Sequence, residues 1–254
     1  MIGFAVDGPI ASVTFDRPEA RNAMTWAMYE SLTEICERLH QDRDVRVVRF
    51  RGAGGAAFVA GTDIAQFRDF RTGDDGVAYE KRIDACIALI ETLPMPTVAV
   101  IEGWAVGGGL AIATACDFRI ATPDSRFGVP IARTLGNCLS IANVARLVAA
   151  LGRPRAQRLL LAAELLDAEE AQAGGYLLDV VPPQDIDGAS DHLCHKLAQL
   201  APVTQAVSKE ALNRLLAHEL PDAEDLIRRA YGSADFHEGV KAFVEKRGPI
   251  WTGK

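Results

Sequence analysis

The sequence predicts an α/β core that is followed by helices alone. Two observations support this prediction. Apolar strand patterns alternate with helix patterns over most of the 254 residues, whereas the last stretch carries helical periodicity only. The length and the 49% content of hydrophobic residues allow one large core to be buried. We therefore expect an α/β core with a helical C-terminal appendage.

The first predicted elements are a hairpin, a helix and a strand. Residues 2–6 and 10–15 alternate enough to form strands, and Asp7-Gly8-Pro9 between them is typical of a tight turn. Thr25 is a suitable N-cap for a helix, whose apolar positions at helical spacing are Met28, Leu32, Ile35 and Leu39. Residues 45–50 form the next predicted strand.

Two strands in the middle of the chain end at glycine. Residues 57–60 are predicted to run into Gly61, and residues 97–101 lead to three glycines that open an apolar helix reaching about Cys116. Between these strands, residues 72–76 have little to bury, so we expect a mobile loop there. A helix over 77–92 follows.

Helices dominate the remainder of the chain. Asp167 with Glu170, and Asp235 with Glu238, have the spacing of capping boxes, and everything from residue 186 onward is predicted to be helical. The other elements predicted are a strand over 118–121, an extended segment over 126–130, a helix over 141–151, a helix begun by Pro154 and a strand over 180–181.

Composition excludes several classes of protein. A net charge of −7 argues against a general binder of nucleic acid or of membrane surfaces, since both need excess cations. The five cysteines are scattered without CxxC spacing, which indicates neither a disulfide framework nor a metal site. The start of the chain lacks the pattern of a signal peptide, and no apolar run is long enough to span a membrane. We therefore expect a cytoplasmic protein without a bound metal.

The two glycine-bearing strand ends are the first candidates for a functional site. Ala60-Gly61-Thr62-Asp63 and Gly107-Gly108-Gly109 each offer backbone N–H groups next to glycine. Two such donors aimed at one carbonyl oxygen form an oxyanion hole. Each stretch alone is also compatible with a simple tight turn.

Five motifs, taken in order, then make the sequence resemble a known family. They are Arg17–Ala23, Ala57–Ile64, the glycine stretch from Gly103 to Cys116-Asp117, Phe127-Gly128-x-Pro130, and Glu238 to Pro249. The motifs span nearly the whole chain without gaps inside any of them. On these residues the chain is identified as similar to the crotonase superfamily, also called the enoyl-CoA hydratase/isomerase family.

This resemblance implies an architecture and an assembly. The expected fold is α/β, a crotonase-like spiral of ββα units over residues 1–195. A C-terminal helical trimerisation region follows over 196–254, so a homotrimer or a hexamer, as a dimer of trimers, is expected. The implied ligand is an acyl-CoA thioester. Coenzyme A then enters as part of the substrate, and no permanently bound cofactor is implied.

The resemblance also implies site residues. The two oxyanion donors are the backbone N–H groups of Thr62 and Gly108. The positions expected to bind coenzyme A are Ala20, Arg21, Ala23, Ala60, Thr62, Asp63 and Ile64 in one subunit, with Phe243 and Lys246 from a neighbouring one. The charges of Arg21 and Lys246 are equally compatible with a solvated surface.

Two departures from the family pattern affect the expected reaction. Hydratases of this family use two glutamates for proton transfer, and at the matching positions this chain has Ala111 and Ile131. Neither side chain transfers protons, so standard hydratase activity is not expected. A lyase or isomerase label remains, with decarboxylation, thioester hydrolysis and carbon–carbon bond chemistry as variants. The alternative is a catalytically silent acyl-CoA-binding oligomer.

A tentative polar pocket is expected near the reacting end of the substrate. Arg133 is suited to binding a carboxylate, although pairing with Asp124 or Asp63 is an alternative. Glu80 is the best spare carboxylate on the predicted helix over 77–92, although a solvated helix face is favoured by the pattern.

Three further polar residues follow Arg133. Cys138 is a possible nucleophile, but its sequence context favours a small apolar filler. Asn137 and Ser140 are candidates to orient water, and helix capping is the favoured alternative for both.

Overall fold

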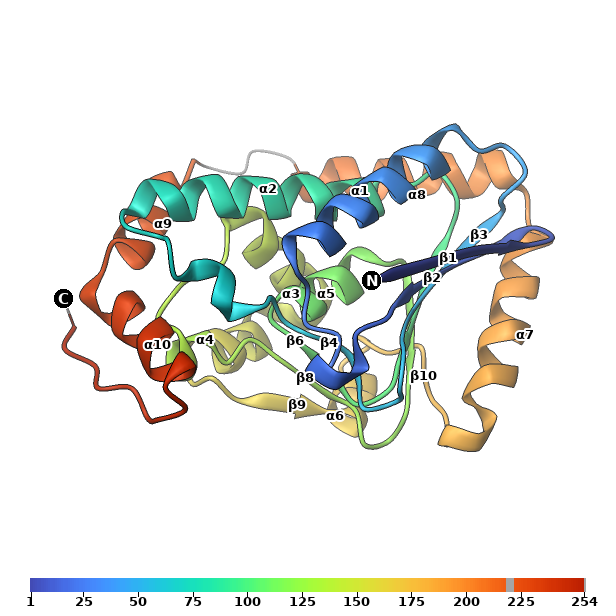
Figure 1. The fold of residues 1–254 in the computed structure, drawn as a ribbon. Helices are drawn as coiled ribbons and strands as arrows, with labels where there is room; N and C mark the ends of the chain where they lie inside the picture. Colours follow the sequence, from blue (N-terminus) through green and yellow to red (C-terminus); the bar gives the residue numbers. More distant parts are fainter. Residues whose placement is uncertain (218–221, 254) are drawn as a thin grey trace.

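The computed structural model describes residues 1–217 and 222–253 and contains two sheets (Figure 1). The larger sheet has six strands. In spatial order these are β1 (Ile2–Asp7), β2 (Ile10–Phe15), β3 (Val47–Gly52), β5 (Thr97–Ile101), β7 (Phe118–Ala121) and β10 (Asp179–Val180). Only the β1–β2 hairpin is antiparallel in this sheet. The predicted hairpin is therefore confirmed.

The smaller sheet has four strands, and these alternate along the chain with strands of the larger one. Its order is β4 (Ala57–Ala60), β6 (Trp104–Val106), β8 (Arg126–Gly128) and β9 (Leu165–Asp167). Strands β3 and β4, β5 and β6, and β7 and β8 follow each other directly, and a helix follows each pair. This repeat is the predicted spiral of ββα units.

Helices enclose the sheets. Their bounds in chain order are η1 (Pro18–Ala20), α1 (Trp26–Gln41), η2 (Ile64–Phe67), α2 (Gly73–Glu91), α3 (Gly108–Ala115), α4 (Ile131–Thr134), α5 (Ile141–Leu161), α6 (Ala168–Ala173), η3 (Pro183–Asp185), α7 (Ile186–Ala198), α8 (Pro202–Ala217), α9 (Glu224–Tyr231) and α10 (Ala234–Val244). No helix in the described ranges is both long and apolar enough to cross a membrane.

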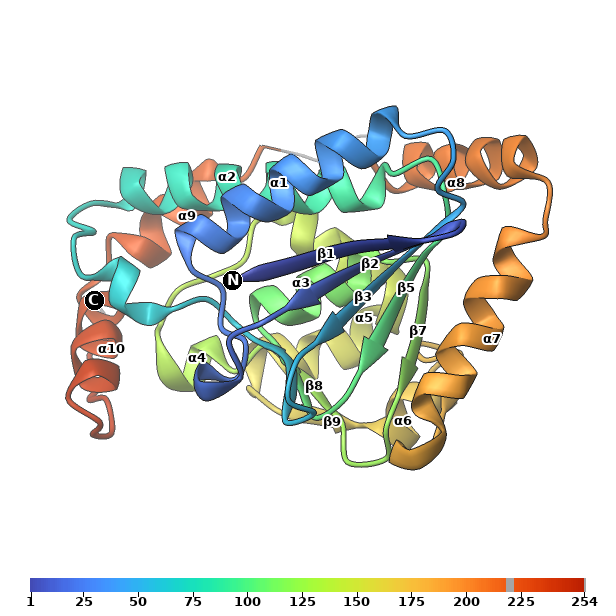
Figure 2. The same ribbon diagram turned by 45° about the vertical axis from the view of Figure 1, so that its right-hand side comes forward.

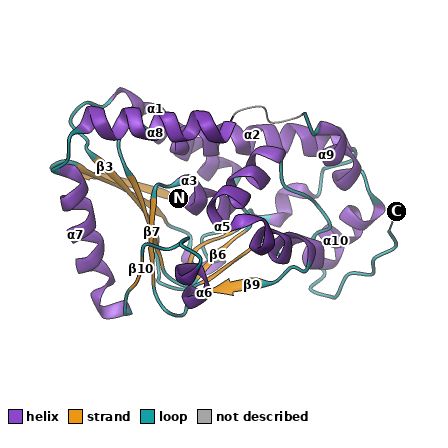
Figure 3. Ribbon diagram, turned by 180° about the vertical axis from the view of Figure 1, so that it is seen from behind, coloured by secondary structure: helices purple, strands orange, loops and turns teal. Residues whose placement is uncertain are grey.

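The six-stranded sheet separates two apolar cores because side chains alternate between its faces. Val13, Phe15 and Phe50 point into the large core beneath α1 and α2. Their neighbours Val47 and Val98 join a smaller core on the opposite face, which α7 covers. Figures 2 and 3 show α7 standing alone on that side of the sheet.

Several predicted details are confirmed. Thr25 caps α1, because its hydroxyl accepts a hydrogen bond from the Met28 N–H at 3.3 Å. Ser140 caps α5 in the same way through the N–H of Asn143. The predicted break near residue 152 is also present, since Gly152 adopts φ +74° and kinks α5 just before Pro154.

The predicted mobile loop over 72–76 is wrong. The Asp75 carboxylate accepts hydrogen bonds from the N–H groups of Arg71 and Thr72, both at 2.8 Å, so α2 already begins at Gly73. Glycine here serves close packing rather than flexibility. A Cβ added at Gly76 would lie 2.1 Å from Cγ of Tyr231 on α9.

The last predicted capping box is also wrong. Ser233 is the N-cap of α10 and accepts from the Phe236 N–H at 3.0 Å. Asp235 instead accepts from Thr252, and Glu238 pairs with Arg247. The side chains that matched the box therefore hold the C-terminal segment against α10.

The predicted boundary at 195/196 lies inside α7, which runs from Ile186 to Ala198. Beyond it, α9 packs along α2, and α10 contacts η2. Tyr231 and Phe236 from these helices belong to the large core. The last two helices therefore form part of the same packed unit as the sheets.

The close contact between α2 and α9 leads to a test. Replacing Gly76 by Ala should lower the free energy of unfolding by about 1–3 kcal/mol, because the added methyl group overlaps the Tyr231 ring. Gly188 in α7 is the matched control, since an added Cβ there meets nothing within 4 Å. Gly188→Ala should raise stability by roughly 0.5–1 kcal/mol through helix propensity. Equal effects of both variants in urea unfolding would contradict the proposed packing constraint.

Candidate active site

The parallel pairing of β4 with β6 brings the two glycine-bearing strand ends together. Ala60 and Val106 are partners in this ladder, so both strands end at the same edge of the sheet. Thr62 and Gly108 each lie two residues beyond these partners. A Cβ added at Gly108 would be 3.5 Å from Oγ1 of Thr62, which confirms that the two segments are adjacent.

The N–H groups of Thr62 and Gly108 remain available in this arrangement. The neighbouring N–H groups are used, since Asp63 donates to the Met24 carbonyl and Gly107 to the Gly128 carbonyl, both at 2.9 Å. Neither Thr62 N–H nor Gly108 N–H donates to an acceptor in the described part of the chain. Gly108 is moreover the first residue of α3, where the helix dipole favours negative charge.

Two glycines are required for this geometry. Gly107 adopts φ +55°, a conformation that costs other residues free energy. Gly109 lies against β4, because a Cβ there would be only 1.9 Å from the Val59 carbonyl oxygen. The glycine run therefore turns the backbone and allows α3 to approach the strand.

Two buried tyrosines hold the Thr62 side chain. Its Oγ1 hydrogen-bonds the hydroxyl of Tyr29 at 2.9 Å and that of Tyr79 at 3.0 Å. Burial raises the pKa of both phenols above the usual value, so both hydroxyls stay protonated near neutral pH. This network comes from α1 and α2 and fixes the loop that carries the Thr62 N–H.

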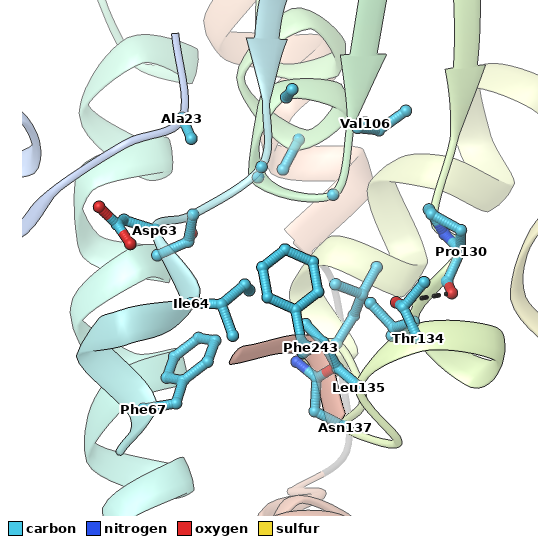
Figure 4. Close-up of a pocket in the computed structure, with 18 of the residues that line it drawn as sticks. Ala23, Asp63, Ile64, Phe67, Val106, Pro130, Thr134, Leu135, Asn137 and Phe243 are labelled. Carbon is cyan, nitrogen blue, oxygen red and sulfur yellow. Dashed lines mark hydrogen bonds between the residues drawn. The ribbon is translucent and has the colours of Figure 1, made fainter. Parts of the chain in front are cut away.

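A cavity of about 510 Å³ opens beside these two N–H groups (Figure 4). Most of the residues predicted to bind coenzyme A line it: Ala20, Arg21, Ala23, Ala60, Thr62, Asp63 and Ile64. Asp63 pairs with Arg17 at 2.9 Å, so the predicted alternative of an Asp63–Arg133 pair is wrong. Arg133 lies exposed on the cavity wall and forms no ion pair with any described residue.

Phe243 lines the cavity of its own chain (Figure 4). Phe236 and Val240 anchor α10 in the core of the same chain, which places Phe243 at this wall. The contact of Phe243 with coenzyme A on a neighbouring subunit stays a prediction. Lys246 follows α10 in an exposed turn with φ +54° and is not among the residues that line the cavity.

Ala111 and Ile131 both face the cavity. Ala111 is buried on α3, and Ile131 is half-buried at the start of α4. The wall at these positions is therefore apolar. Among the described residues, no three His, Cys, Asp or Glu side chains lie together as a possible metal site.

Glu80 is buried, so the favoured prediction of a solvated helix face is wrong. Its Oε1 accepts from the Tyr231 hydroxyl at 2.6 Å, and its Oε2 accepts from the Ser140 N–H at 3.0 Å. Only 3% of the residue is exposed, and this burial raises the pKa of the carboxyl to about 7. Glu80 lies three residues from both Val77 and Ile83 on the buried face of α2, and this spacing could have indicated its burial.

Asn137 and Cys138 differ in their relation to the cavity. Asn137 lines it, and its Nδ2 donates to Tyr231 at 3.1 Å, while its buried Oδ1 has no hydrogen-bond partner among the described atoms. Cys138 does not line the cavity, and burial raises the pKa of its thiol to about 12. A thiol in this state is a poor nucleophile near neutral pH.

Three important tyrosines were not predicted as parts of a hydrogen-bonded site. Tyr29 lies on a helix that looked purely structural, and Tyr231 lies in the region assigned to oligomerisation. Tyr79 precedes Glu80 on the helix predicted over 77–92. Their roles depend on contacts between distant segments, which no local pattern indicates.

Comparisons with known proteins agree with this architecture. Residues 6–254 match the family described as Enoyl-CoA hydratase/isomerase. A short-chain-enoyl-CoA hydratase from Clostridium acetobutylicum is 31% identical over 245 residues, covering 95% of this chain and 93% of the relative. An enoyl-CoA hydratase/carnithine racemase from Magnetospirillum magneticum has 32% identity and a TM-score of 0.81, with coverage of 100% and 96%.

A methylmalonyl-CoA decarboxylase solved with 2S-carboxypropyl-CoA is also similar. Its TM-score is 0.90 at 25% identity, and the match covers 100% of this chain and 98% of the other. The likeness to crotonase-fold relatives thus covers the whole sequence. The chain belongs to the enoyl-CoA hydratase/isomerase family.

Proposed function

We propose that this protein is an acyl-CoA enzyme that stabilises a thioester enolate with the backbone N–H groups of Thr62 and Gly108. The observation that carries the proposal is the pair of available N–H groups at adjacent strand ends beside one cavity. Donors of this kind stabilise charge that develops on a carbonyl oxygen, by about 2.7–4 kcal/mol each.

The reaction that these residues support best is the decarboxylation of a 2-carboxyacyl-CoA. Hydration and isomerisation need a protein base, and the two usual positions hold Ala111 and Ile131. In decarboxylation the bond between the α-carbon and the carboxyl carbon breaks and CO₂ leaves. The electron pair of that bond stays on the thioester and forms the enolate, so no base is needed. The fold likeness to methylmalonyl-CoA decarboxylase supports the same choice.

The apolar wall favours this reaction physically. A carboxylate is poorly solvated beside aliphatic side chains, whereas neutral CO₂ loses little solvation free energy there. Leu135 and Leu139 continue the wall that Ala111 and Ile131 begin. The charge that leaves the carboxylate moves to the enolate oxygen, next to the two N–H donors.

We also propose that the protein forms the trimer or hexamer implied by its family. Supporting this, α8 presents the large apolar side chains of Val203, Val207, Leu212 and Leu215 to solvent, each at least 61% exposed. Burying them against another copy removes apolar surface from water.

The proposed reaction is tested directly by turnover. With methylmalonyl-CoA the purified enzyme should release CO₂ and form propionyl-CoA, measured by mass spectrometry, whereas crotonyl-CoA should remain unhydrated. Binding of acyl-CoAs in calorimetry without conversion of any of them would instead indicate a silent acyl-CoA-binding protein. Hydration of crotonyl-CoA by the wild-type enzyme would overturn the preference for decarboxylation.

The proposed oxyanion donor at residue 108 can be tested by adding a side chain at this position. A Cβ added at Gly108 would lie 2.7 Å from the Tyr29 hydroxyl, so Gly108→Ala should displace the loop and lower kcat by about 10²–10³-fold. Removing the obstructing hydroxyl in Gly108→Ala/Tyr29→Phe should restore part of kcat. Gly188→Ala is the control, with kcat unchanged. Full activity of Gly108→Ala would contradict the proposed donor geometry.

The missing glutamates can be restored. In Ala111→Glu/Ile131→Glu the cavity regains an acid and a base, and each such group contributes about 10²–10⁴-fold to rate. We expect measurable hydration of crotonyl-CoA, at least about 100-fold above the wild-type rate. Hydration is measured as the loss of absorbance of the conjugated enoyl thioester. Each single variant serves as a control and should remain far less active. No gain in the double variant would show that the cavity excludes the hydratase geometry.

A further inference from the structure

The cavity contains few groups that can transfer a proton near neutral pH. Among the described residues, its acidic side chains are Asp63, Tyr79 and Glu80. Asp63 is engaged in an ion pair with Arg17 at 2.9 Å. Burial raises the pKa of Tyr79 well above its usual value, and the phenol is already bonded to Thr62. Glu80 is therefore the carboxyl group in the cavity that can both hold and release a proton.

The position of Glu80 connects it to the proposed oxyanion donors. It follows Tyr79 on α2, and the Tyr79 hydroxyl bonds Oγ1 of Thr62 at 3.0 Å. Glu80 and both donor residues line the same cavity. Helix α2 thus places a carboxyl group close to the loop that would hold the enolate oxygen.

Two hydrogen bonds orient the Glu80 carboxyl. The Tyr231 hydroxyl on α9 donates to one oxygen, and the Ser140 N–H at the start of α5 donates to the other. Each oxygen keeps one further position for a proton or a hydrogen bond. The two donors bond different oxygens and come from different helices, so the orientation of the carboxyl is defined.

The electrostatic surroundings set the proton affinity of this carboxyl. Burial raises its pKa to about 7, the Tyr231 and Ser140 hydrogen bonds oppose the rise, and the charge of Asp84 on the same helix adds to it. Besides burial, the charge of Glu80 in turn raises the pKa of four neighbouring titratable groups, which are Tyr29 on α1, Tyr79, Cys138 and Tyr231. A substantial protonated fraction is therefore present near neutral pH.

We propose that Glu80 is a catalytic residue that delivers a proton to the α-carbon of the thioester enolate. This role rests on the proposed function. After CO₂ leaves, the enolate electron pair forms the new C–H bond while the Glu80 O–H bond breaks. The carboxylate then takes a proton from water, so the sum is 2-carboxyacyl-CoA plus one proton giving acyl-CoA and CO₂. Glu80 replaces the proton-transfer groups missing at residues 111 and 131.

The test uses methylmalonyl-CoA in D₂O, because protonation then creates a stereocentre in the product. The wild-type enzyme should yield one stereoisomer of 2-deuteriopropionyl-CoA. In Glu80→Gln the enolate takes deuterium from solvent on either face, so equal amounts of both isomers are expected. The rate of CO₂ release should stay within about tenfold of the wild-type rate, because a general acid that acts only in the later step does not take part in C–C cleavage. Gly188→Ala on α7 is the control, since an added Cβ there meets nothing within 4 Å, and it should keep one isomer.

The pH profile distinguishes this role from a structural one. Only the protonated carboxyl delivers deuterium, so stereospecific labelling should fall as pH rises through the Glu80 pKa, near 7. Tyr231→Phe removes a bond that lowers this pKa and should move the midpoint to higher pH. Asp84→Asn removes a charge that raises it and should move the midpoint to lower pH. A merely structural residue would show neither shift.

The possible failures are distinguishable. If the wild-type enzyme releases no CO₂, the proposed function is wrong, and this role falls with it. If CO₂ is released and Glu80→Gln keeps a single labelled isomer, the proposed function stands and the role of Glu80 is overturned. If Glu80→Gln fails to fold, Tyr231→Phe decides the question, because an unshifted midpoint in that variant overturns the role.

Discussion

The parallel pairing of β4 with β6 is the constraint on which the rest of the site depends. It places the ends of two strands, 46 residues apart at Ala60 and Val106, next to each other at one edge of a sheet. From there Gly107 turns the chain and Gly109 lets α3 pack directly on β4. Without this close approach, the N–H groups of Thr62 and Gly108 would not share a cavity.

Several helices around this strand pair contribute residues to the cavity. Helix α1 and helix α2 supply the tyrosines that hold Thr62, while α9 and the start of α5 orient Glu80. Helix α10 completes the wall with Phe243. The α2–α9 contact is especially close, because glycine at residue 76 leaves room for the Tyr231 ring. Packing and site geometry are therefore coupled through the same residues.

The apolar positions 111 and 131 change the chemistry that this arrangement supports. A hydratase needs groups that move protons to and from water, whereas an enolate formed by loss of CO₂ needs a proton only afterwards. A single buried carboxyl is sufficient for that later step. In the proposed mechanism, the cavity stabilises the enolate charge with backbone N–H groups and uses a carboxyl on a different wall for proton transfer.

Local sequence patterns determined much of this protein. Apolar periodicity predicted the strands and most helices, because strand and helix patterns depend on neighbouring residues. The residues expected at the cavity were implied by the family resemblance that the motifs carry. Predictions failed where distant segments meet. Gly73 and Gly76 lie in α2 and pack closely against Arg228 and Tyr231 of α9, and Asp235 binds Thr252 instead of capping a helix. The burial of Glu80 was likewise decided only by tertiary structure, since its partners Tyr231 and Ser140 are 151 and 60 residues away in the chain.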